Sequence, residues 1–206
     1  ISMPALLYLH GFNSSPASAK AQQTQQWFAQ NAPEIEFICP ELPPYADRAM
    51  ALLCAIVNAQ RSDSIWVIGS SMGGFYATCL VEKFGSENIA AVLINPAVSP
   101  ARGLDKWLGE NSNYHSGETW LFEPQHIDEY RRWDPQVIKK QKNYLVLLQS
   151  GDEVLDYRDA QQRYTGCNII LESGGDHSFI DYHRHLETIH QFLVAAAVRN
   201  QKNNLT

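Results

Sequence analysis

Residues 65–74, Ile-Trp-Val-Ile-Gly-Ser-Ser-Met-Gly-Gly, constrain the fold of this chain more than any other segment. Four consecutive apolar residues indicate a buried strand, and the stretch 75–84 that follows the glycines has helical character. A Gly-x-Ser-x-Gly pattern between a strand and a helix is the context of a nucleophile elbow, which holds a serine at a strained backbone position. Glycines are expected on both flanks because side chains there would collide with the neighbouring strand and helix. The alternative interpretation is a glycine–serine turn that carries no chemistry.

Apolar runs that indicate further strands recur along the chain, at 5–9, 35–39, 91–96, 144–149 and 168–172. Segments of helical composition separate them, at 17–28, from about Asp47 to Val57, at 158–164 and at 185–198. Strands that alternate with helices predict βαβ units and a mainly parallel sheet with helices on both faces. We therefore expect an α/β fold in a single domain over 3–198, followed by a polar tail at 199–206.

Residues 97–142 differ in character from the rest of the chain. Strand-like runs are absent there, and aromatic residues are mixed with charged ones. Because this stretch lies between two predicted strands, it is predicted to be a helical, lid-like insertion over one end of the sheet. Its aromatic residues either pack on the core or line an apolar substrate pocket, and their spacing does not decide between the two.

Charge and cysteine content restrict the class of protein. The formal net charge of −6 disfavours nucleic acid as a partner, and no polybasic patch is present to bind anionic lipid. No apolar run approaches the 18 or so residues that cross a bilayer, so no membrane association is expected. The four cysteines are far apart and show no zinc-binding spacing, and no cofactor or metal site is predicted. A cytoplasmic location is expected, since a disulfide framework is not.

Two later turns carry the partners that an elbow serine needs. A serine hydroxyl is a weak nucleophile at neutral pH and requires a base, which in turn is oriented by an acid. In this type of fold the acid and then the histidine follow the serine along the chain. Asp152 and His177 each follow a predicted strand, and the carboxyl ends of parallel strands meet at one edge of a sheet. We predict Ser71 as nucleophile, His177 as base and Asp152 as acid; Asp156 is the alternative acid, or a helix cap.

Acyl transfer also needs hydrogen-bond donors for the oxyanion. The first predicted donor is the backbone N–H of Met72, the residue after the nucleophile. The second is the N–H of Phe12, in the loop after the first strand, where Gly11 allows a tight turn. This loop and the insertion supply the predicted substrate-binding residues, which are Gly11, Asn13, Trp107 and Trp120.

Four motifs together resemble the α/β-hydrolases, and more narrowly the small bacterial YqiA-type esterases. They are His-Gly-Phe at 10–12, Gly-Ser-Ser-Met-Gly-Gly at 69–74, Gly-Asp-Glu-Val-Leu-Asp at 151–156 and Gly-Gly-Asp-His-Ser-Phe at 174–179. The likeness extends from Leu6 to about Leu193. It implies the α/β-hydrolase fold and an esterase that acts on short acyl esters or thioesters of small molecules, with Ser71, Asp152 and His177 as the triad.

The chain departs from this family pattern in two places. Its His-Gly loop follows the first strand directly, so the initial antiparallel strands of larger α/β-hydrolases are not expected. Asp156 stands where many relatives carry a proline after the acid turn. Two alternative functions stay open: an amidase or peptidase that uses the same residues, and a ligand-binding protein on the same scaffold that has no catalytic activity. A dehalogenase is disfavoured, because its nucleophile would be an aspartate in place of Ser71.

Overall fold

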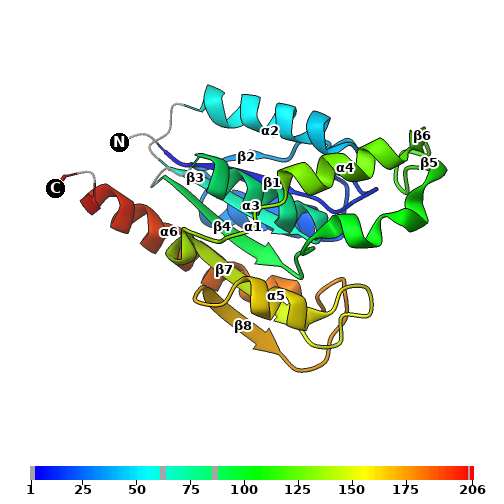
Figure 1. Cartoon of the computed structure of the whole chain (residues 1–206). Coiled ribbons are helices and arrows are strands. Elements are labelled where there is room, and N and C mark those ends of the chain that lie inside the picture. Colours follow the sequence, from blue (N-terminus) through cyan, green and yellow to red (C-terminus); the bar gives the residue numbers. More distant parts are fainter. Residues whose placement is uncertain (1–2, 61–63, 85–87, 204) are drawn as a thin grey trace.

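The structure, a computed structural model, describes residues 3–60, 64–84, 88–203 and 205–206. A six-stranded sheet in the order β2-β1-β3-β4-β7-β8 forms its centre, and every pairing in this sheet is parallel (Figure 1). Its strands are β1 (Ala5–Leu9), β2 (Glu36–Ile38), β3 (Ile65–Ser70), β4 (Ile89–Ile94), β7 (Tyr144–Gln149) and β8 (Asn168–Glu172). The predicted parallel sheet is confirmed.

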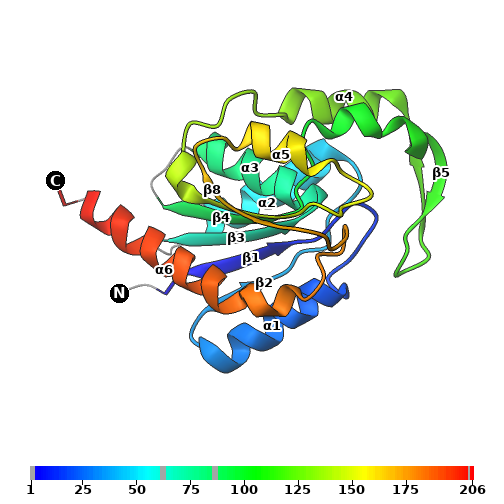
Figure 2. The ribbon, with the colours of Figure 1, turned by 90° about the horizontal axis from the view of Figure 1, so that it is seen from below.

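Helices cover both faces of this sheet, as predicted. They are α1 (Ala19–Asn31), α2 (Ala46–Ala59), α3 (Met72–Phe84), α4 (Pro124–Trp133), α5 (Tyr157–Arg163) and α6 (Leu186–Asn203). Figure 2 shows α1 and α6 on one face and α2 and α3 on the other. Successive strand side chains point to opposite faces, so β1 sends Leu7 and Leu9 to the core beneath α2 and α3. Leu6 and Tyr8 of the same strand pack in the core beneath α1 and α6.

The insertion between β4 and β7 contains strands, so the expectation that 97–142 is purely helical was wrong. It comprises the 3-10 turns η1 (Pro100–Gly103), η2 (Asp105–Trp107) and η3 (Gln141–Asn143), the strands β5 (Gly109–Ser112) and β6 (Thr119–Phe122), and α4. β5 and β6 pair antiparallel as a hairpin, which lies beyond the carboxyl ends of the central strands (Figures 1 and 2). β5 contains no apolar residue, and the apolar run in β6 is only three residues long, Trp120–Phe122, so neither strand resembles the buried strands of the central sheet.

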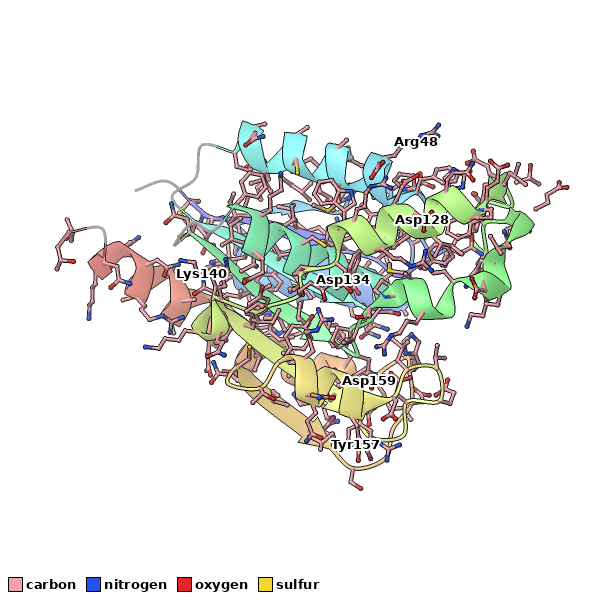
Figure 3. The ribbon with its side chains drawn as sticks, in the orientation of Figure 1. Arg48, Asp128, Asp134, Lys140, Tyr157 and Asp159 are labelled. Carbon is pink, nitrogen blue, oxygen red and sulfur yellow. The ribbon has the colours of Figure 1, made fainter. Side chains whose placement is uncertain are left out.

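Hydrogen bonds fix the insertion to the core at several points. Asn13 in the first loop donates to the Ser112 carbonyl at 3.0 Å and accepts from the Trp120 indole at 3.2 Å. At the other end, Asp134 follows α4 and pairs with Arg163 of α5 at 3.2 Å, and both side chains are largely buried. Figure 3 shows Asp134 between these two helices. The insertion is therefore held against both the first loop and α5.

The predicted polar tail is helical for most of its length. α6 continues to Asn203, whereas the sequence predicted an end at about 198; residue 204 lies outside the described residues. Asn200 is buried, and the Arg199 guanidinium donates to the Lys142 carbonyl at 2.8 Å. These tertiary contacts explain why polar residues remain helical there. In the described part of the chain, no helix is both long enough and apolar enough to cross a bilayer.

Candidate active site

Ser71 occupies the turn between β3 and α3 with a positive φ of 57°. This region is uncommon for a residue with a side chain, so its surroundings must stabilise it. The Ser71 N–H donates to the Ile94 carbonyl at 3.0 Å, and the Ser71 carbonyl accepts from Gly74 and Ala97 at 2.9 Å each. The serine backbone is thus held between β4 and the start of α3.

The glycines of the motif are required by close backbone approach. A Cβ on Gly73 would overlap the carbonyl group of Leu9 in β1, and a Cβ on Gly69 would overlap the Gly73 carbonyl. A Cβ on Gly74 would lie 2.6 Å from the Cβ of Pro96. Strand β1, the elbow and the loop after β4 therefore pack closer together than any side chain at these positions allows.

Substitution of Gly73 by Ala should lower the free energy of unfolding by about 3 kcal/mol or more, since the new methyl group meets rigid backbone. Alanine favours helix over glycine by up to about 1 kcal/mol, so the expected loss is opposite to the helix propensity. Urea denaturation measures the change. Gly103→Ala is the matched control, because a Cβ there meets nothing within 4 Å. Equal effects of the two substitutions would contradict the steric explanation.

The structure brings Ser71, His177 and Asp152 into one hydrogen-bonded chain. His177 Nε2 lies 3.0 Å from Ser71 Oγ, and His177 Nδ1 lies 2.9 and 3.0 Å from the two carboxylate oxygens of Asp152. The Asp152 side chain is 2% exposed and the His177 side chain is 23% exposed. Asp152 follows β7 and His177 follows β8, so the parallel sheet sets both beside the elbow.

Backbone donors orient the carboxylate of Asp152. Its Oδ1 accepts hydrogen bonds from the N–H groups of Val154 and Leu155, each at 2.9 Å. Asp156, the alternative acid, lies elsewhere: it caps α5 and forms an ion pair with Arg158 at 2.9 Å. These two contacts hold the pKa of the exposed Asp156 carboxyl below its ordinary value. Asp152 is therefore the carboxylate that faces His177.

Asn95, the residue after β4, holds the loop that carries the histidine against the end of β7. Its side chain is buried and donates to the carbonyls of Asp176 and His177 at 3.0 and 3.2 Å. It also accepts from the Gln149 N–H at 3.0 Å. Glu153 accepts from the His177 N–H at 3.0 Å. Asn95 was not among the predicted site residues; the signal for it in the sequence is a polar side chain between a buried strand and Pro96.

The loop after β1 lies directly against the nucleophile. A Cβ on Gly11 would be 3.6 Å from the Cβ of Ser71. His10 is buried; its Nδ1 donates to the Gly11 carbonyl and its Nε2 accepts from the Leu42 N–H, both at 2.8 Å. Burial lowers the pKa of His10, which favours the neutral ring that these contacts require. His10 thus shapes the loop that carries Phe12.

One predicted oxyanion donor, Phe12, lies in this loop, and the other, Met72, lies in the elbow. Met72 is the first residue of α3, and the first N–H groups of a helix have no partner within it. Phe12 follows Gly11, and both line a cleft of about 380 Å³ together with Ser71 and His177. Met72 adjoins Ser71 in the chain and Phe12 lines the same cleft as Ser71, and their role as oxyanion donors stays a prediction.

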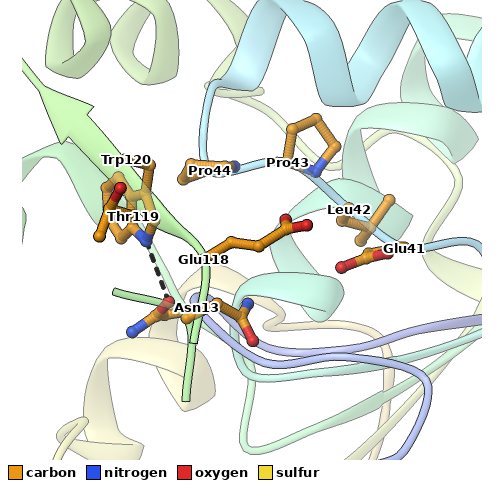
Figure 4. Close-up of a pocket in the computed structure, with 9 residues that line it drawn as sticks. Asn13, Glu41, Leu42, Pro43, Pro44, Glu118, Thr119 and Trp120 are labelled. Atoms are coloured by element: carbon orange, nitrogen blue, oxygen red, sulfur yellow. Dashed lines mark hydrogen bonds between the residues drawn. The ribbon is translucent and has the colours of Figure 1, made fainter. Parts of the chain in front are cut away.

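The predicted substrate-binding residues fall into two places. Gly11 lines the cleft beside Ser71. Asn13 and Trp120 line a separate pocket of about 300 Å³, beneath the hairpin and against the loop 41–44 (Figure 4). Trp107 stacks on Trp120 with ring centroids 6.2 Å apart, and its centroid is 5.1 Å from that of Phe12. Among the described residues, no group of three or more metal-ligating side chains is close enough to hold an ion.

An elbow serine at the carboxyl end of a parallel strand, with an acid and a histidine after later strands, is the arrangement of the α/β-hydrolase superfamily. The chain belongs to uncharacterised protein family UPF0227, whose family model matches residues 5–194, and the resemblance to YqiA-type proteins is thereby confirmed. The fold is similar to that of Est1E from Butyrivibrio proteoclasticus, solved with ferulic acid bound. The TM-score is 0.75 at 17% identity, with 96% of this chain and 90% of Est1E covered.

Two further solved structures share the fold. A hydrolase assigned as putative from Agrobacterium vitis S4 gives a TM-score of 0.70 at 18% identity, covering 93% of this chain and 88% of that protein. A structure from work on the metagenome-derived lipolytic enzymes LipS and LipT gives 0.62 at 18% identity, with 94% of each chain covered. At these identities the comparisons establish the α/β-hydrolase fold.

Proposed function

We propose that this protein is a serine esterase that hydrolyses short-chain carboxylic esters or acyl thioesters through an acyl-enzyme intermediate. One observation carries the proposal: the unbroken hydrogen-bonded chain from Ser71 through His177 to the buried Asp152. The strained backbone of Ser71 supports it, since residues with strained backbone angles cluster at active sites. Lipolytic enzymes among the proteins of similar fold also support it.

Each residue has a defined part in the proposed reaction. Ser71 Oγ attacks the substrate carbonyl carbon while His177 Nε2 accepts the hydroxyl proton, and Asp152 stabilises the imidazolium that forms. The N–H groups of Met72 and Phe12 bind the oxyanion of the tetrahedral intermediate, each worth about 3–4 kcal/mol in such sites. His177 then protonates the leaving alcohol. A water molecule, deprotonated by the same histidine, releases the acid and restores Ser71.

Covalent labelling tests the proposal directly. A fluorophosphonate probe should modify the folded protein at one serine, and peptide mass spectrometry should locate the adduct on Ser71. Heat-denatured protein is the control, because labelling depends on the folded triad. The labelled protein should also lose its ability to hydrolyse p-nitrophenyl butyrate. Absence of both labelling and turnover would instead favour the non-catalytic, ligand-binding alternative.

The same assay separates an esterase from an amidase. Ester and amide hydrolysis use the same nucleophile and base, so the triad geometry alone does not distinguish them. We expect kcat/KM for p-nitrophenyl butyrate to exceed that for the matching p-nitroanilide by several orders of magnitude. A preference for the anilide would assign the site to the amidase or peptidase class.

A further inference from the structure

We propose that Lys20 binds a carboxylate on the substrate, so that the cleft selects esters of small, negatively charged molecules. This inference rests on the proposed esterase function and defines its substrate class. Lys20 is the second residue of α1 and lines the same cleft as Ser71 and His177. Its ammonium group donates to the carbonyl of Ser178, the residue after the histidine, at 2.9 Å. The positive charge of Lys20 is thereby held against the residue that follows the proposed base, His177.

The Lys20 ammonium has further N–H donors that can bind a ligand. An ammonium group has three N–H donors, and the Ser178 carbonyl accepts from one of them. The nearby carboxylates have donors of their own: Glu153 accepts from the His177 N–H at 3.0 Å, and Asp176 accepts from the Ser178 hydroxyl at 2.5 Å. Partial burial lowers the pKa of Lys20, while Asp176 opposes that shift. A partly desolvated cation gains more from an anion than one in bulk water does.

The rest of the cleft is lined by polar groups. Phe12 contributes its one large apolar side chain among the described lining residues. Glu153 contributes a carboxylate, and the residues that carry hydroxyl groups form the largest set: Tyr8, Ser14, Ser18, Ser70, Ser71 and Ser178. Tyr8 and Ser70 are already buried, but a long hydrocarbon chain would remove the half-buried Ser14 and Ser18 from water without replacing their hydrogen bonds, which is unfavourable. A short, charged substrate can bond to them. The aromatic rings of Trp107 and Trp120 do not line this cleft; Trp120 lines the second pocket.

Two matched substrate pairs test the proposal and locate the charge. For a charge on the alcohol part, 4-acetoxybenzoate is compared with 4-acetoxytoluene. For a charge on the acyl part, monoethyl glutarate is compared with ethyl hexanoate. Titration at constant pH follows hydrolysis of all four esters. In at least one pair, wild-type protein should prefer the charged ester by kcat/KM. Lys20→Met should lower that charged-to-neutral ratio by about 10- to 100-fold, as expected for a lost charge-assisted hydrogen bond.

Two further variants make the result specific to the charge at this position. Lys20→Arg should retain most of the preference because it keeps the cation. Lys140→Met removes an ammonium at the opposite end of the sheet from the hairpin, and it should leave the ratio unchanged (Figure 3).

A ratio that Lys20→Met leaves unaltered in both pairs would overturn the inference. So would a protein whose Ser71 reacts with fluorophosphonate but which shows no preference for either charged ester. If Ser71 does not react with the probe, the proposed esterase function itself fails.

Discussion

Ser71→Ala should lower kcat for p-nitrophenyl butyrate by about 10⁵- to 10⁶-fold, the loss typical of a serine hydrolase without its nucleophile. The expected loss is large because the oxygen that forms the acyl-enzyme is removed, while the oxyanion donors and the cleft remain. The fold should persist, since the bonds that hold this turn are made by the Ser71 backbone. Single-turnover and steady-state measurements with both proteins provide the comparison.

Thermal unfolding is the control for this substitution. Alanine and serine have a similar preference for the backbone angles of Ser71, so the melting temperature should shift by only a few degrees. A folded Ser71→Ala protein that retains a tenth or more of the wild-type turnover would remove Ser71 from the mechanism. The covalent adduct on another serine would then identify the true nucleophile.

Much of the fold follows from local patterns in the sequence. The four inner strands of the sheet, β1, β3, β4 and β7, are buried on both faces, so each appears as a largely apolar run that can be recognised without knowledge of its neighbours. The proximity of Asp152 and His177 to Ser71 could be anticipated because the carboxyl ends of parallel strands meet at one edge of the sheet. The choice of Asp152 over Asp156 used the same rule, since Asp152 comes first after β7.

Features that depend on tertiary contacts could not be predicted in this way. The β5–β6 hairpin is stabilised by Asn13, about a hundred residues earlier in the chain, and not by a pattern within its strands. Asn95 acquires its contacts only when the end of β7 and the loop after β8 fold against it. Lys20 appears in the sequence as an ordinary helix-surface lysine. Its position beside Ser178 arises from the packing of α1 next to the last loop.

Asp152→Asn should give the second large effect. It should lower kcat by about 10⁴-fold, because the asparagine holds His177 in the wrong tautomer. The N–H groups of Val154 and Leu155 both donate to Oδ1 of Asp152. An asparagine amide oxygen will therefore occupy that position, and its NH₂ group will take the place of Oδ2, which lies 2.9 Å from His177 Nδ1. The histidine must then accept at Nδ1 and carry its proton on Nε2, where it cannot deprotonate Ser71.

Asp156→Asn is the matched control, because it makes the same chemical change four residues away. Asp156 is exposed, and asparagine caps a helix about as well as aspartate, so kcat should stay within about twofold of wild type. Parallel kcat/KM measurements on the two variants, with circular dichroism to verify folding, decide the assignment. Large loss of activity in Asp156→Asn with little in Asp152→Asn would transfer the role of acid to Asp156. That transfer would require a rearrangement of the turn, since Asp152 alone of the two contacts His177 among the described residues.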